Sequence, residues 1–260
     1  MDYQDILFNV RNGAAWITIN RPEKMNAFRG QTCEELIHAL NRAGYDREIG
    51  SIVLAGAGER AFCTGGDQSA HNGQYDGRGT IGMPVEELHA AIRDVPKPVI
   101  ARVQGYAIGG GNVLCTICDF TIASAEAIFG QVGPKMGSVD PGYGTAFLAR
   151  VVGEKKAREM WYLCKRYTAT EALAMGLVNA VVPRDQLDIE VQRWCDEIME
   201  KSPTAIAIAK RSFNMDTAHQ AGIAGMGLLS LKMYYDTEES REGVKALQEK
   251  RKPNFRKFAK

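Results

Sequence analysis

Two glycine-rich turns hold the residues of this sequence whose types and spacing could do chemistry. The first, Gly105 to Cys118 (GYAIGGGNVLCTIC), places three consecutive glycines before an apolar, helix-like segment. A helix that begins at Gly110 or Gly111 leaves its first backbone N–H groups unpaired, and such donors suit an oxygen that develops negative charge. The second, Phe62 to Gln68 (FCTGGDQ), follows an apolar strand-like run and can present the N–H of Gly66. One glycine cluster alone is better explained by close packing, but two N–H groups aimed at one oxygen would form an oxyanion hole.

Four segments in chain order resemble the signatures of the crotonase, or enoyl-CoA hydratase/isomerase, superfamily. They are NRPEKMNAF (20–28), FCTGGDQ (62–68), GYAIGGGNV (105–113) and FGQVGPKMGSVDPGYG (129–144). This resemblance covers nearly the whole chain, and it implies an α/β fold with a crotonase-like ββα spiral core, a C-terminal helical region and an acyl-CoA substrate. Within the superfamily, these segments and the run 161–183 are similar to the 1,4-dihydroxy-2-naphthoyl-CoA synthases. They are more similar still to the ring-cleaving 2-ketocyclohexanecarboxyl-CoA hydrolases.

The resemblance implies that Gly66 and Gly110 supply the two oxyanion-hole N–H groups. A departure from the superfamily lies at the positions of the two glutamates that enoyl-CoA hydratases use as acid and base. Here those positions are Val113 and Gly133. Without either carboxylate, the addition of water to a carbon–carbon double bond lacks its acid and its base. Hydration is therefore not the expected activity.

Three other residues are the expected catalytic side chains. Asp140, in the segment SVDPGYG, is the carboxylate that remains near the site, and it matches an aspartate of the naphthoyl-CoA synthases. The alternative role for such a residue is to form a turn or to cap a helix. Ser138 matches a serine that contacts the ring end of the substrate, and Tyr235 matches a C-terminal tyrosine that reaches the active site.

The acyl group is expected to meet three further residues, Tyr75, Val132 and Gly133. Glycine-type naphthoyl-CoA synthases have Q-T-G where this chain has Q-V-G, and they hold a bicarbonate that serves as the base. Gly133 would leave the same space, but Val132 lacks the hydroxyl that would hydrogen-bond the anion. Water is thus favoured over bicarbonate or another anion, and no permanently bound cofactor or metal is expected.

The resemblance also implies where the CoA portion of the substrate binds. Arg21 and Lys24 lie after the first predicted strand, where the family contacts the nucleotide, and Lys250 matches a lysine near the C-terminus. Basic side chains suit phosphates, although surface lysines commonly serve only solubility. The pantetheine and thioester are expected to lie against the backbone of the two turns, at Thr64, Gly65, Asp67, Gln68, Tyr106, Ile108 and Gly109.

These residues together predict a hydrolase that opens a cyclic β-keto acyl-CoA through an enolate held by two N–H groups. With 2-ketocyclohexanecarboxyl-CoA the product would be pimeloyl-CoA, a reaction of anaerobic aromatic-ring degradation. One alternative is the ring closure of o-succinylbenzoyl-CoA by a naphthoyl-CoA synthase. Another is a scaffold that binds acyl-CoA without catalysis.

Alternating strand and helix patterns must position the two turns. Apolar runs of strand length alternate with helical spacing, which predicts crossover units and a largely parallel sheet. The predicted strands are 14–20, 51–56, 98–103 and 120–123, and the first predicted helix is 32–43. The glycine-rich stretch 68–83 has little periodicity, and we expect it to form a mobile lid over the site.

Helical spacing dominates the sequence from Lys155 onward. Asp185 and Ser202 are the expected N-caps of two helices, and Pro203 suits a first helical position. The predicted helices are 155–166, 170–175, 185–200 and 203–214. We expect residues 1–200 to form the core with the CoA and oxyanion site. The resemblance implies that residues 201–260 pack across a neighbouring subunit in a trimer or hexamer.

Composition and charge argue against several classes of protein. The 260 residues are 45% hydrophobic with a net charge of +1, which opposes charge-driven binding to nucleic acid or a membrane surface. No apolar run approaches the roughly 20 residues that span a bilayer. Neither turn has a dinucleotide or P-loop motif. Cys115 and Cys118 are a close pair without a second pair, which favours buried reduced thiols in a cytoplasmic protein over a metal site.

Overall fold

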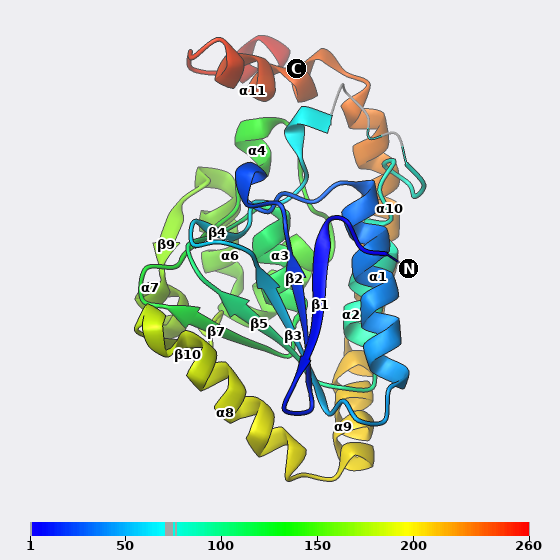
Figure 1. Cartoon of the computed structure of the whole chain (residues 1–260). Coiled ribbons are helices and arrows are strands. Elements are labelled where there is room, and N and C mark those ends of the chain that lie inside the picture. The colour runs from blue at the N-terminus through cyan, green and yellow to red at the C-terminus, as the bar shows by residue number, and fades with distance from the viewer. Residues whose placement is uncertain (1, 71–74, 76, 260) are drawn as a thin grey trace.

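A six-stranded sheet is the main layer of the computed structural model, which describes residues 2–70, 75 and 77–259. Its strands follow the order β1-β2-β3-β5-β7-β10, and every neighbouring pair is parallel except β1 with β2 (Figure 1). All six residues of β3 are buried, as expected for a parallel strand that is covered on both faces. The strands are β1 (Ile6–Arg11), β2 (Ala14–Ile19), β3 (Ser51–Gly56), β5 (Val99–Val103), β7 (Phe120–Ser124) and β10 (Ala180–Val182).

Helices cover both faces of this sheet, and the alternation of side chains along the strands decides which residue meets which helix. Ile17 and Leu54 join the larger core with α1 (Gly30–Tyr45), α2 (Val85–Asp94) and α3 (Gly110–Ile117). Trp16 and Val53, one position earlier on each strand, join a second core under α8 (Leu187–Met199). The predicted α/β class is confirmed by this architecture.

A second sheet of four short strands, in the order β4-β6-β8-β9, positions the glycine turns. Strands β4, β6 and β8 run parallel, so their carboxyl ends meet at one edge of the sheet. The turn with Gly66 follows β4, the turn with Gly110 follows β6, and Gly133 follows β8. Three segments that are distant in the sequence therefore converge at that edge. The strands are β4 (Ala61–Cys63), β6 (Tyr106–Ile108), β8 (Ile128–Gly130) and β9 (Arg166–Thr168).

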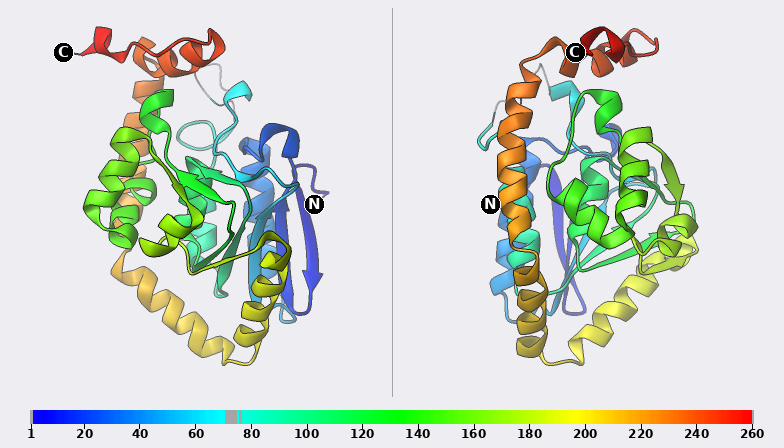
Figure 2. Two further views of the ribbon diagram at one scale, coloured as in Figure 1. Left: turned by 90° about the vertical axis from the view of Figure 1, so that its left-hand side faces the viewer. Right: turned by 180° about the vertical axis from the view of Figure 1, so that it is seen from behind.

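The C-terminal part of the chain is helical, as expected. Helix α10 runs along the outside of the molecule, and α11 lies across its end above α4 (Figures 1 and 2). Gly243 of α11 packs directly against the Met136 backbone of α4, where a side chain at Gly243 would not fit. The remaining helices are α4 (Gly133–Met136), α5 (Leu148–Val152), α6 (Glu154–Leu163), α7 (Ala169–Ala174), α9 (Pro203–Asp216), α10 (His219–Tyr235) and α11 (Glu238–Gln248). The short 3-10 or π turns are Pro22–Lys24, Gln68–Ala70, Tyr143–Phe147, Arg184–Gln186 and Phe255–Phe258.

The two predicted N-caps have opposite outcomes. The Ser202 hydroxyl accepts a hydrogen bond from the Ala205 N–H at 3.3 Å, and Pro203 occupies the first turn of α9, as predicted. The prediction for Asp185 is wrong. That residue lies within a 3-10 turn, and α8 begins two residues later without a side-chain cap. The turn already directs the chain into the helix, so no capping side chain is needed there.

Lys210 ties α9 to the main sheet, and its loss should destabilise the fold. Its ammonium donates to Asp119 at 2.7 Å and to the carbonyls of Ile92 and Lys97 at 2.9 Å each. The Lys210 side chain is only 6% exposed, so Lys210→Ala would remove the cationic partner of Asp119, which would keep only its hydrogen bond from the Val99 N–H, and one donor from each of the two carbonyls. We expect a loss of about 3 kcal/mol in the free energy of unfolding, measured by urea denaturation. The exposed Lys201→Ala is the control, and an equal, small effect for both variants would contradict this prediction.

No helix in the described ranges is long and apolar enough to cross a membrane. All six cysteines are free thiols, and Cys115 and Cys118 are both buried. Burial raises the pKa of both thiols, which keeps them protonated at neutral pH. Of the predicted lid, residues 71–74 and 76 lie outside the described residues, so its mobility stays a prediction. The division at residue 200 and the trimer or hexamer also stay predictions.

Candidate active site

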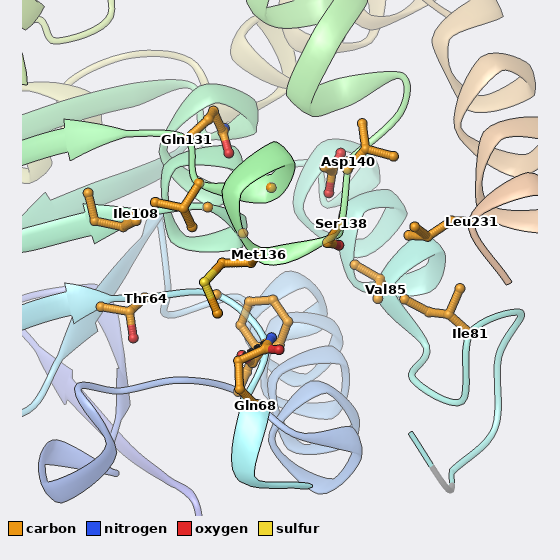
Figure 3. A pocket seen from close by; sticks show the side chains of 18 of the residues that line it. Thr64, Gln68, Ile81, Val85, Ile108, Gln131, Met136, Ser138, Asp140 and Leu231 are labelled. Atoms are coloured by element: carbon orange, nitrogen blue, oxygen red, sulfur yellow. Dashed lines mark hydrogen bonds between the residues drawn. The ribbon is translucent and has the colours of Figure 1, made fainter. Parts of the chain in front are cut away.

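A cavity of about 460 Å³ opens at the edge where the short parallel strands end. Thr64 and Ile108 lie toward one end of it, and Ser138, Asp140 and Leu231 lie toward the other (Figure 3). The glycines of both turns line the same cavity. This arrangement gives the cavity a backbone-lined middle at the glycine turns and an end lined by Leu228, Leu231 and Tyr235 of α10.

The two predicted oxyanion donors, Gly66 and Gly110, come from turns that touch each other. A Cβ on Gly65 would lie 2.8 Å from the Gly110 nitrogen, and Gly65 has a φ of +86° that favours glycine. The Phe28 N–H donates to the Gly65 carbonyl, and the Asp67 N–H donates to the Phe28 carbonyl, at 2.9 Å each. Phe28 is thus hydrogen-bonded to the residues on both sides of Gly66. The Gly66 N–H takes no part in these two hydrogen bonds.

Among the described residues, neither the Gly66 N–H nor the Gly110 N–H has a hydrogen-bond acceptor. Gly110 is the first residue of α3, where a backbone N–H has no partner within the helix. Two unpaired donors in contacting turns, both lining one cavity, suit an oxygen atom that gains negative charge. The expected oxyanion hole thus has a consistent geometry, and its catalytic role stays a prediction.

The two positions that hold glutamates in hydratases offer no carboxylate and no room for one. Val113 is completely buried in the larger core. A side chain on Gly133 would overlap the Ser138 carbonyl and would lie 2.7 Å from Cζ3 of Trp161. The Gly133 backbone lines the cavity, and the expected water or anion beside it stays a prediction. The Trp161 indole N–H is also engaged, because it donates to the Gly144 carbonyl.

Asp140 lies at the inner end of the cavity, on the segment that links α4 to the Tyr143–Phe147 turn. Its Oδ1 accepts a hydrogen bond from the Gly144 N–H at 2.9 Å, so the carboxylate also has the capping role given above as its alternative. Burial raises the pKa of Asp140 to about 7, an effect that this single hydrogen bond opposes. A carboxyl group with that pKa can both accept and return a proton near neutral pH.

Glycine contacts hold the Asp140 segment in place. Gly137 has a φ of +78°, and its α-carbon packs against the Ser240 carbonyl of α11. Gly142 has a φ of +81°, and a Cβ there would lie 2.8 Å from the Ala224 Cβ of α10. Side chains at either position would push the segment away from the C-terminal helices. The close approach of α10 and α11 thus fixes the backbone that presents Ser138 and Asp140.

Ser138 and Tyr235 meet at the same end of the cavity, as the resemblance implied. The Ser138 Oγ and the Tyr235 hydroxyl are 2.7 Å apart, and Tyr235 is the last residue of α10. Burial raises the pKa of Tyr235, and the nearby Asp140 charge adds to the effect. Tyr235 therefore stays protonated at neutral pH and can donate a hydrogen bond.

Tyr75 lies beside Gly66, one residue of the predicted oxyanion pair. It is 7% exposed, and its hydroxyl occupies the place that a Cβ on Gly66 would take. The Gln68 amide donates to that hydroxyl at 3.4 Å. Burial raises the pKa of Tyr75, which keeps it a neutral hydrogen-bonding group. Its predicted contact with the substrate fits this position and remains untested.

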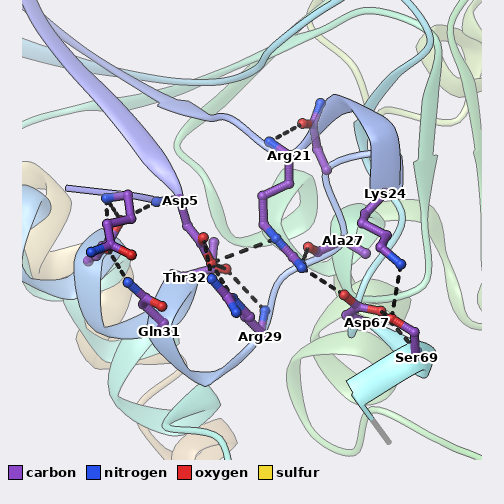
Figure 4. A network of polar contacts seen from close by, with 12 residues as sticks. Asp5, Arg21, Lys24, Ala27, Arg29, Gln31, Thr32, Asp67 and Ser69 are labelled. Carbon is purple, nitrogen blue, oxygen red and sulfur yellow. Dashed lines mark hydrogen bonds and ion pairs between the residues drawn. The ribbon is translucent and has the colours of Figure 1, made fainter.

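The residues expected to bind CoA divide into two groups. Arg21 lies outside the cavity lining, in a network that pairs its guanidinium with Asp67 at 2.8 Å and with Asp5 at 3.7 Å (Figure 4). Its side chain is 11% exposed, so this geometry favours a structural role over a nucleotide contact. Lys24 donates to the Ser69 hydroxyl, and Lys250 follows α11, away from the cavity lining. Predicted positions that do line the cavity are Thr64, Gly65, Gln68, Tyr75, Tyr106, Ile108, Gly109, Val132 and Gly133.

Sequence reasoning missed the apolar inner wall and one charged lining residue. Phe28 lies within a motif segment, but its contact with the Gly110 turn had no separate signal. Helical spacing in α2 could have indicated a buried face, whereas Arg166 lies in the run 161–183, to which the resemblance assigned no site residue. The additional lining residues are Met25, Phe28, Ile81, Met83, Val85, Gln131, Met136, Val139, Trp161, Arg166, Leu228 and Leu231.

Comparisons with known proteins agree with this architecture and confirm the predicted crotonase-like fold. The family model for enoyl-CoA hydratase/isomerase matches residues 9–258. The structure is similar to an enoyl-CoA hydratase from Mycobacterium avium subsp. paratuberculosis K-10, with a TM-score of 0.86, 30% identity, and coverage of 97% of this chain and 99% of that chain. It is also similar to a carnitinyl-CoA hydratase from Mycobacterium avium, with a TM-score of 0.85, 28% identity, and coverage of 96% and 98%.

A third similar structure is a monofunctional enoyl-CoA isomerase from M. smegmatis, with a TM-score of 0.72, 29% identity, and coverage of 82% of this chain and 94% of that chain. The chain belongs to the enoyl-CoA hydratase/isomerase family, whose members are typically enzymes that act on acyl-CoA thioesters.

Proposed function

We propose that this protein hydrolyses a cyclic β-keto acyl-CoA, opening the ring to give a dicarboxylic acid monothioester. The preferred substrate is 2-ketocyclohexanecarboxyl-CoA, and the product is pimeloyl-CoA. The observation that carries this proposal is the composition of the acyl end. Among the described lining residues, Asp140 is the one that carries a carboxyl group, and the two positions that hold glutamates in hydratases, Val113 and Gly133, have none.

In the proposed reaction, ionised Asp140 removes a proton from water as the water oxygen attacks the ring ketone. The Ser138–Tyr235 pair donates a hydrogen bond to the ketone oxygen, which becomes an alkoxide. Collapse of this intermediate restores a C=O double bond, now part of a carboxyl group, and breaks the bond to the α-carbon. The released electron pair moves into the thioester, and the enolate oxygen accepts hydrogen bonds from the N–H groups of Gly66 and Gly110.

Protonation of the α-carbon by Asp140 completes the cycle. The proton taken from water returns to carbon, so one water is consumed and no redox cofactor takes part. A pKa near 7 suits both steps, because the carboxyl group changes protonation state twice in each turnover. The apolar side chains of Ile81, Val85 and Leu231 at this end suit an alicyclic ring (Figure 3).

Direct turnover assays test this proposal. The purified protein is incubated separately with 2-ketocyclohexanecarboxyl-CoA, o-succinylbenzoyl-CoA and crotonyl-CoA, and products are identified by mass spectrometry. We expect pimeloyl-CoA from the first and no hydration of crotonyl-CoA. Naphthoyl-CoA without pimeloyl-CoA would instead identify a ring-closing synthase. Hydration of crotonyl-CoA would show that the two missing glutamates are not required for that reaction. No turnover of any of these acyl-CoA substrates would favour the alternative, a scaffold that binds acyl-CoA without catalysis.

A further inference from the structure

Two charged side chains occupy the cavity lining among the described residues, and they lie at different parts of it. Asp140 is at the acyl end, next to Ser138 and below α10. Arg166 is the cationic one, and it belongs to β9 at the edge of the four-stranded sheet. Catalysis as proposed uses Asp140 and leaves Arg166 without a role.

The strand register places Arg166 across Gly130 from β6, on the Ile108 side of the cavity. Arg166 is paired with Gly130 of β8, and Gly130 is paired with Ile108 of β6. Because Gly130 has no side chain, the Arg166 side chain can extend across it toward β6. Its guanidinium carbon lies 5.5 Å from the centre of the Tyr106 ring, two residues before Ile108 on the same face of that strand.

This cation is available to a ligand. Arg166 is an exposed residue, and no carboxylate in the described part of the chain forms an ion pair with it. The Tyr106 ring orients the guanidinium without neutralising it. Its neighbour Lys165, by contrast, is paired with Glu159 at 3.1 Å. Arg21, the arginine expected to bind the nucleotide, is likewise paired with two carboxylates.

The direction of the substrate follows from the fixed points of the cavity. The thioester belongs at the Gly66 and Gly110 N–H groups, and the acyl group extends toward Asp140. The CoA arm must then leave on the other side, past Ile108 and Tyr106, and Arg166 stands along this exit. An oriented guanidinium suits a phosphate group, to which it can donate two parallel hydrogen bonds.

We infer that Arg166 binds the diphosphate of CoA and is a determinant of affinity for CoA thioesters over shorter thioesters. This inference depends on the acyl-CoA chemistry of the family and on the orientation of the thioester in the cavity. It does not depend on ring cleavage.

Titration calorimetry on the full-length protein tests the assignment with CoA, 3′-dephospho-CoA and pantetheine as ligands. We expect Arg166→Ala to raise the Kd for CoA and for dephospho-CoA by about tenfold, because a charge-assisted contact is lost. The Kd for pantetheine should change by less than about twofold, and 0.5 M NaCl should narrow the difference between wild type and variant for CoA.

Lys165→Ala is the matched control, since it removes an adjacent positive charge that is already paired, and its Kd for CoA should stay near wild type. A Kd for CoA unchanged in Arg166→Ala would overturn the inference. Equal losses for CoA and pantetheine would also overturn it, because the contact would then be with the pantetheine arm. Circular dichroism checks that the variant is folded. Since binding needs no turnover, failure of the ring-cleavage assay would leave this result standing.

Discussion

Replacing Asp140 by asparagine should abolish ring cleavage and, above pH 7, make the protein more stable. The amide cannot accept the proton of the attacking water, so we expect kcat to fall by about 10³-fold. Its oxygen can still accept the hydrogen bond from the Gly144 N–H, which preserves the local fold. Wild-type kcat/KM should rise with pH through about 7, where Asp140 ionises, and the residual rate of Asp140→Asn should lack this step.

The stability effect has a definite sign. Asp140 loses its proton near pH 4 in the unfolded chain but only near pH 7 in the folded protein, so the free energy of unfolding falls as pH rises between these values. Asparagine removes this loss. Because the carboxyl group partly faces the cavity, we expect a gain of about 2 kcal/mol at pH 8, or about 4 °C in Tm, and none at pH 4. Full activity in the variant would exclude Asp140 as the base, and a Tm difference independent of pH would show that its ionisation does not oppose folding.

Substitution of Gly110 by alanine should remove most of the activity because it disturbs the predicted oxyanion hole. A Cβ at this position would lie 2.7 Å from Cζ of Phe28 and 3.2 Å from the Gly65 α-carbon. The two turns must move apart, which displaces one N–H from the developing enolate oxygen. Loss of one such donor lowers kcat by about 10² to 10³-fold in comparable sites.

Gly222→Ala provides a matched control for this substitution. Gly222 also lies in a helix, α10, but a Cβ there would meet no atom within 4 Å. We expect unchanged kcat and a gain of up to about 1 kcal/mol in the free energy of unfolding, from helix propensity alone. Steady-state kinetics and thermal melts on both variants separate the two cases. If Gly110→Ala kept wild-type kcat with its fold intact, the two amides would not act on the reacting oxygen.

Several elements could be predicted from the sequence because one local signal decides each of them. Strand β3 matches the predicted 51–56, since an apolar run between turn residues marks a buried parallel strand. Helix α3 begins at Gly110, within the glycine run 109–111, as the sequence indicated. Helix α9 begins at Pro203 after its serine cap. Each of these signals is contained within a few neighbouring residues.

Other elements have no comparable local signal. Helix α10 is apolar around much of its circumference, with Met226 and Met233 exposed, so its sequence lacks the periodic stripe that marks an amphipathic helix. The strands of the second sheet are only three residues long, and pairing between distant segments defines them. Helix α2, at 85–94, follows the irregular stretch and was not predicted.

The candidate site shows the same division. Gly66, Gly110, Ser138 and Asp140 could be located because motif segments contain them. Their meeting in one cavity depends on the parallel ends of β4, β6 and β8. Arg166 lies within the run 161–183, but the resemblance assigned it no role, and only the register across the side-chain-free Gly130 shows that it approaches Tyr106 at the cavity.

The packing at Gly133 has a consequence for how this protein can change. A glutamate there would collide with the Ser138 carbonyl and the Trp161 ring, and a glutamate at Val113 would bury a charge in a fully enclosed position. No single substitution restores the acid–base pair of a hydratase. The whole 137–144 segment, clamped by two C-terminal helices, would have to be rebuilt first. A gain of alkene hydration by this chain would therefore require several substitutions together.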